Sequence, residues 1–132
     1  MTLPERYIEA VAVAILAVNS YPVARVMKIV PRLRTGTLLT PSYVAALELG
    51  PLTAQLYEAG YDRGMLTWRI AERFHHLMVA VDNGALDALE DLVARNDQIE
   101  AVRVLLTLRG VGPKVATAAW ALMVEAASVE RK

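Results

Sequence analysis

Cysteine is absent from the 132 residues of this sequence. The chain therefore forms no disulfide, and it offers no thiolate to a structural zinc ion or an iron–sulfur cluster. Lack of disulfides is typical of a reducing compartment, so we expect a cytoplasmic protein. Histidine is scarce too, because His75 and His76 are the only two. Neighbours on a helix point about 100° apart, so this pair cannot chelate one metal ion without further ligands. We expect no metal site and no cofactor.

Long apolar runs are also missing. The longest one, residues 10–18, is too short to cross a bilayer, and it lacks the flanks and the cleavage site of a secretory signal. We expect this run to be a buried helix, and we expect no contact with a membrane. Hydrophobic residues still make up 55% of the chain. The sequence therefore predicts one globular domain over residues 1–132 with a core of its own.

An excess of one charge is the third absence, since the formal net charge is zero. The charges are unevenly placed, however. Residues 1–34 carry five basic and two acidic side chains, whereas residues 82–100 carry one basic and six acidic ones. Residues 101–124 carry Arg103, Arg109 and Lys114 and no acid. If the fold brings the two positive zones to one face, a modest phosphate-binding surface results. Scattered solvated charges are the alternative. The acids Asp82, Asp87, Glu90 and Asp91 suggest a carboxylate cluster, but a helix stop at 82–84 followed by a solvated face is the simpler interpretation.

Proline and glycine divide the sequence as they do in helical proteins. Five of the six prolines stand where a helix would begin, and no stretch has the alternation and turn signals of a strand. Thr2 and Glu5 have the spacing of a capping box. The pattern predicts an all-α fold, a compact orthogonal bundle of about six to eight helices. The expected helices cover 4–18, 22–33, 41–50, 51–60, 62–81, 85–93, a segment that begins after Asn96 or Asp97, and 113–129.

Apolar spacing predicts which side chains these helices turn toward the core. In the second helix the expected stripe includes Met27. In the helix before residue 107 the expected buried face consists of Ile99, Val102, Leu105 and Leu106. The large side chains Trp68, Phe74 and Trp120 are expected in the core as well.

The most informative segment is residues 108–116, which read Leu-Arg-Gly-Val-Gly-Pro-Lys-Val-Ala. They predict the end of a helix, a hairpin built on Gly110 and Gly112, and a second helix that begins at Pro113. We expect both glycines to take a positive φ and to let another backbone approach closely. Unpaired amides and the positive end of the helix dipole would then face an anionic oxygen. An ordinary corner between two packed helices is the alternative.

This segment matches the helix-hairpin-helix motif of DNA-binding proteins and resembles the version found in the HhH-GPD family of base-excision DNA glycosylases, such as endonuclease III. The resemblance implies a six-helix domain that begins with an apolar helix and ends in the hairpin. It implies DNA as the partner, with phosphate bound by Arg109, Gly110, Val111, Gly112 and Lys114.

Two further segments extend the resemblance. The turn after the first helix, residues 18–21, lies where family members carry a segment that wedges into DNA, and Asn19 would supply the wedge amide. A Gly-aromatic pair precedes a basic helix, so Tyr61 would stack on bases, or else pack the turn onto the core. Arg25 would add positive charge beside the hairpin.

Lys114 stands where bifunctional family members keep the lysine that forms a Schiff base with DNA. A helix N-terminus disfavours the ammonium form, so the place suits a nucleophile, but a simple phosphate contact is the interpretation we favour. The family's catalytic aspartate segment has no counterpart in residues 124–132. Residues that would form the second wall of a base-binding pocket are missing too. The sequence thus resembles the DNA-binding half of a glycosylase, and we expect no glycosylase activity.

Three functions remain open at this point. The first is a protein that binds DNA phosphates with little sequence preference. The second is an abasic-site lyase or other base-modifying repair enzyme that uses Lys114 and is completed by a partner or by a homodimer. The third is a protein-interaction module, for which the high apolar content would supply a binding surface.

Overall fold

Helix α1 (Leu3–Leu16) forms the centre of the computed structural model, which describes residues 2–130. The predicted capping box is confirmed, because the Thr2 hydroxyl accepts from the Glu5 amide and the Glu5 carboxylate accepts from the Thr2 amide. From Ala10 to Leu16 every side chain is buried. A helix that is apolar on all sides must be surrounded, and α1 packs against α2, α5, α6 and α8.

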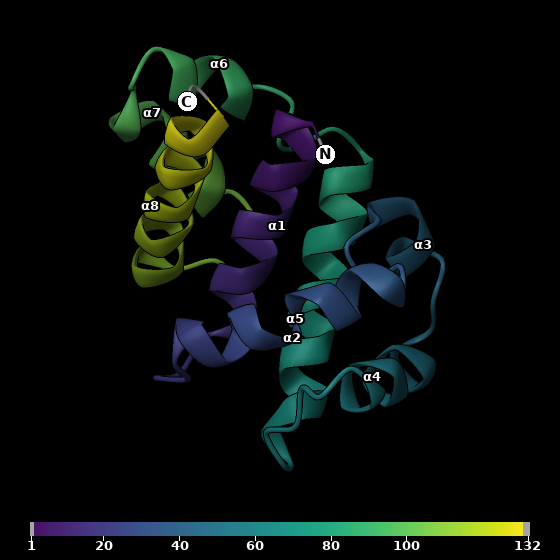
Figure 1. Ribbon diagram of the computed structural model, residues 1–132. Helices are drawn as coiled ribbons and strands as arrows, with labels where there is room; N and C mark the ends of the chain where they lie inside the picture. Colours follow the sequence, from purple (N-terminus) through teal and green to yellow (C-terminus); the bar gives the residue numbers. More distant parts are fainter. Residues whose placement is uncertain (1, 131–132) are drawn as a thin grey trace.

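Seven further helices follow α1 in the described part of the chain, which contains no strand (Figure 1). The predicted all-α class is therefore confirmed. The buried side chains of all eight helices form one cluster. None of the helices within residues 2–130 has the length and apolar character that a bilayer crossing requires. The seven are α2 (Val23–Thr35), α3 (Pro41–Ala45), α4 (Leu49–Glu58), α5 (Leu66–Asp82), α6 (Leu89–Ala94), α7 (Gln98–Leu106) and α8 (Pro113–Glu130).

The boundary expected at Gly50 and Pro51 is wrong. Helix α3 already ends at Ala45, and α4 begins at Leu49, so both residues lie in the first turn of α4. The first amides of a helix have no acceptor within the helix, so a proline there removes no hydrogen bond. A proline near the start of a helix therefore locates that start only to within a turn.

Several side chains expected in the core are exposed. Trp68 is 52% exposed, Ile99 is 86% exposed, and Met27 and Leu106 are about half exposed. Phe74 and Trp120 are buried as predicted. Helix α7 turns its smaller Ala101 inward together with Leu105, which rotates Ile99 out into solvent. The apolar pattern thus predicted the helix correctly and its inward face in part, because Leu105 is buried and Val102 packs against the core.

Tyr61 ties the end of α1 to the start of α5. It is fully buried, and its hydroxyl donates to the Leu16 carbonyl over 2.5 Å. The ring meets the ring of Tyr21 edge to face, with centroids 5.6 Å apart. The expectation that Tyr61 stacks on bases is therefore wrong, and the alternative, a tyrosine that packs the turn onto the core, is confirmed. Burial raises the pKa of Tyr61 from 10.0 to about 12.

Tyr61→Phe removes the hydroxyl and leaves the Leu16 carbonyl without its buried donor. We expect the free energy of unfolding at neutral pH to fall by about 1–2 kcal/mol, measured by urea denaturation. Because the pKa of Tyr61 is raised on folding, its contribution is complete below pH 10.0 and is lost as pH rises toward about 12. The stability gap between wild type and variant should therefore narrow over that range. A gap that stays constant would contradict this account of Tyr61.

Candidate nucleic-acid interface

The predicted hairpin connects α7 to α8. Leu108 and Val111 are buried and anchor it to the core, while Arg109 and Gly110 are exposed. The Val111 amide donates to the Leu108 carbonyl over 3.2 Å and closes the turn. Helix α8 begins at Pro113, as expected. The anchors are thus apolar, and the exposed tip carries the backbone and the charge.

The two glycines of the hairpin differ from each other. Gly110 has a φ of +86°, as predicted, and a Cβ there would lie 3.2 Å from the Cγ atom of Arg73. The fold itself therefore requires this glycine. For Gly112 the expectation is wrong, because its φ lies outside the left-handed region. Apart from Gly112 and its two chain neighbours, no heavy atom of the described residues lies within 4 Å of a Cβ built at Gly112. Nothing in the described fold requires the glycine at 112.

Backbone amides at the start of α8 are unpaired. The Gly112 carbonyl accepts from the Ala116 amide over 2.9 Å, which makes Gly112 the N-cap residue. Thr2 and Asp97 cap α1 and α7 with their side chains. A glycine N-cap has no side chain to offer. Within residues 2–130 the amides of Gly112, Lys114 and Val115 accordingly donate no hydrogen bond.

Asn19 lies in an exposed turn directly after α1. Asn19 and Ser20 both have a positive φ, 61° and 66°. The Arg63 guanidinium stabilises this turn, because it donates to the Val18 carbonyl and, over 3.1 Å, to the Asn19 carbonyl. The Asn19 side chain thus stands on an exposed turn that Arg63 holds in place. The sequence assigned Arg63 only to a basic helix and did not connect it with this turn.

Arg25 is exposed beside the same turn. Its guanidinium carbon lies 5.0 Å from the centroid of the Tyr21 ring, and that of Arg63 lies 4.5 Å from the same centroid. Arg25 begins the positive series of α2, but the series does not act as one group. Arg34 at its end forms an ion pair with Glu9, at 2.5 Å. The Glu9 carboxylate raises the pKa of Arg34 by this hydrogen bond.

The hairpin and the turn after α1 lie at the same end of the molecule. Helices α1 and α8 pack antiparallel, so the start of α8 lies near the end of α1 (Figure 1). Helix α5 joins them from the third side, since the stem of Arg73 borders Gly110. We call this end the basic end. Its basic side chains are Arg25, Arg63, Arg69, Arg73, Arg109 and Lys114.

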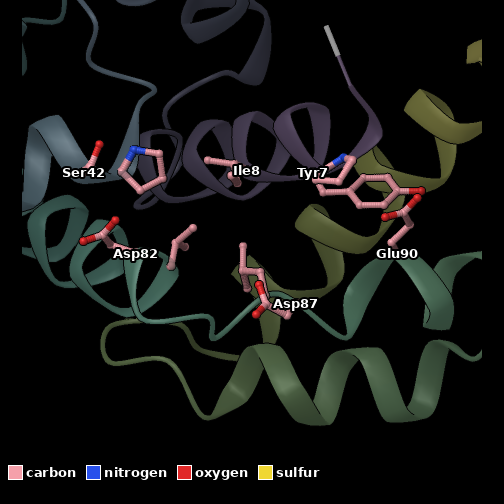
Figure 2. A pocket seen from close by; sticks show the side chains of 10 residues that line it. Tyr7, Ile8, Ser42, Asp82, Asp87 and Glu90 are labelled. Carbon is pink, nitrogen blue, oxygen red and sulfur yellow. The ribbon is translucent and has the colours of Figure 1, made fainter.

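A pocket of about 420 Å³ lies elsewhere, between the start of α1 and the end of α5. Figure 2 shows Tyr7 and Glu90 at one side of it and Ser42 and Asp82 at the other. Asp87 lines it too, so its polar lining is mostly acidic. The sequence suggested a carboxylate cluster for these acids but favoured a helix stop and a solvated face, and the fold brings Asp82, Asp87 and Glu90 to one pocket. No group of three potential metal ligands forms in the described residues.

We expect the two hairpin glycines to respond differently to substitution. Gly110→Ala places a Cβ on a positive φ and against Arg73, so it should lower the free energy of unfolding by about 1–2 kcal/mol. Gly112→Ser adds a side chain in open space, where its hydroxyl can cap α8, so stability should stay equal or rise by a few tenths of a kcal/mol. Urea denaturation of both variants measures this. Equal destabilisation by the two changes would refute the distinction.

Comparisons of this chain with protein-family models, with curated proteins and with solved structures found no match. The hairpin and the basic end are therefore the observations from which a function can be proposed.

Proposed function

We propose that this protein binds the phosphate backbone of DNA through the hairpin between α7 and α8. The observation that carries this proposal is Gly112. Its φ needs no glycine, and its missing Cβ leaves open space in front of unpaired amides. A glycine that the fold does not need suits a backbone that a ligand must approach closely.

An anionic oxygen is the ligand that suits these amides best. The free N–H groups of Gly112, Lys114 and Val115 begin an 18-residue helix, whose dipole adds partial positive charge at that point. No acidic side chain lies in the first turn of α8. The exposed Lys114 and Arg109 can neutralise the same phosphate or its neighbour. We call these three free amides and the side chains of Lys114 and Arg109 the phosphate clamp.

A chain of phosphates suits the basic end better than a single one. Arg25 beside the turn after α1 and Arg73 beside Gly110 extend the positive charge beyond the hairpin, and Arg69 lies one helical turn before Arg73 in α5. These contacts read no base edge, so little sequence preference is expected. The acidic side chains of the pocket between α1 and α5 repel phosphate. This repulsion would orient the molecule with its basic end toward DNA.

Binding without catalysis is the second part of the proposal. Cleavage of a glycosidic bond would use a carboxylate together with Lys114. Within the described residues Lys114 forms no hydrogen bond or ion pair with a carboxylate. The resemblance to HhH-GPD glycosylases then concerns the DNA-binding half. Lys114 acts on this account as a phosphate contact.

Replacement of Lys114 by Gln should weaken the binding of duplex DNA equally for unrelated sequences. It should also lower the slope of log affinity against log salt concentration by about one, since one phosphate contact is lost. Fluorescence anisotropy of labelled duplexes over a salt series measures both quantities. Arg95→Gln is the matched control, because it removes one exposed positive charge from the acidic region after α6.

Gly112→Ser tests the clamp separately from charge. The serine hydroxyl would take up an amide of α8 and fill the space for the phosphate, so DNA affinity should fall while stability is kept. Undetectable binding of wild type at low salt, or equal affinities of wild type, Lys114→Gln and Gly112→Ser, would rule out the proposed function.

Borohydride reduction with abasic-site DNA separates binding from lyase chemistry. Only a Schiff base leaves a covalent adduct after reduction, and we expect none on denaturing gels. An adduct that disappears in Lys114→Gln would instead assign an abasic-site lyase.

A further inference from the structure

Two large apolar side chains at the start of α5 are exposed among arginines. Met65 is 97% exposed and Trp68 is 52% exposed. Met65 directly follows the loop that Arg63 holds against the turn after α1, and Arg69 comes next to Trp68. The rest of this chain buries neither side chain fully, and contact with water does not favour large apolar side chains.

We propose that Met65 and Trp68 contact unstacked bases, so that the preferred ligand is DNA with unpaired bases next to a duplex. This inference rests on the proposed phosphate clamp. An apolar side chain can insert between base steps, and an exposed indole can stack on a base that has left the helix. Continuous duplex offers neither surface without the cost of unstacking.

The segment that carries Met65 is held rigidly. The Asp62 carboxylate accepts from the Gly64 amide over 2.8 Å, and the Gly64 carbonyl accepts from the Tyr57 hydroxyl over 3.0 Å. The Thr67 hydroxyl accepts from the Arg63 amide over 2.7 Å. The backbone of this segment is therefore already ordered, so entry of Met65 into a base step costs side-chain entropy but no further ordering of the loop.

The position relative to the hairpin is also suitable. Arg73 borders Gly110, and Arg69 lies one turn earlier on the same face of α5. Met65 lies eight residues before Arg73, about 12 Å along the helix, which equals roughly three to four base steps. A strand held at the hairpin can thus follow the two arginines and present its bases to Met65 and Trp68.

Charge favours a nucleic acid over a protein as the occupant. Between residues 62 and 73 the chain carries Arg63, Arg69 and Arg73 against Asp62 and Glu72, and the Asp62 carboxylate is bonded to the Gly64 amide. Another strongly exposed apolar side chain, Ile99, has Asp97 and Glu100 as close neighbours in the sequence. A phosphate strand can approach the first site, whereas the second would repel it.

Trp68 can report the contact directly. The chain has two tryptophans, and Trp120 is buried at 7% exposure. Titration with a duplex that contains a central unpaired loop should quench the exposed Trp68 emission, and the loop duplex should bind about tenfold tighter than continuous duplex of equal length. Met65→Ala and Trp68→Ala should each reduce this preference while they leave the affinity for continuous duplex unchanged.

Ile99→Ala is the control, because it removes an equally exposed apolar side chain from α7 and should change neither affinity. Equal affinity for both duplexes with unquenched Trp68 would overturn this inference and leave the phosphate clamp intact. Absence of any DNA binding would overturn both. A doubling of mass in light scattering that Met65→Ala and Trp68→Ala abolish, without effect on DNA binding, would assign the pair to a second copy of the chain and overturn the inference.

Discussion

The antiparallel packing of α1 against α8 is the contact on which the proposed interface depends. It is the most extensive contact between two helices in the described part of the chain, and both helices contain fully buried alanines, Ala12 in α1 and Ala116 and Ala119 in α8. Because the two helices run in opposite directions, the first turn of α8 meets the end of α1. The hairpin and the turn at Asn19 are distant in the sequence, and this packing makes them neighbours. A parallel arrangement would have separated them by the length of α1.

Tyr61 and Arg63 add the third segment to that end. One side chain bonds the last carbonyl of α1, and the other bonds two carbonyls of the turn that follows. Both residues come from the loop before α5, so the start of α5 is fixed beside the turn. Met65 and Trp68 are exposed on the segment that these bonds hold beside the turn.

Local features of the fold were predictable from the sequence, and their assembly was not. The cap at Thr2, the cap at Asp97 and the helix start at Pro113 depend on neighbouring residues alone, and all three are confirmed. The inward faces of α5 and α7 depend on which helix packs where. Ile99 and Trp68 fit an apolar stripe as well as their buried neighbours do, so spacing alone could not place them. Burial of Tyr61 likewise needs the end of α1 beside it.

In the candidate site, too, some residues could be understood from the local sequence and others only from the tertiary structure. Gly110 could be predicted as a structural glycine, because its positive φ belongs to the local turn. The meaning of Gly112 could not, because an unneeded glycine is recognised only when the space around it is known. A hairpin that served helix packing alone would use both glycines for close contact or positive φ. Here one glycine meets Arg73 and the other meets solvent in front of free amides. That asymmetry favours a ligand at Gly112 over a purely structural corner, and it makes position 112 the place where stability and binding can be separated.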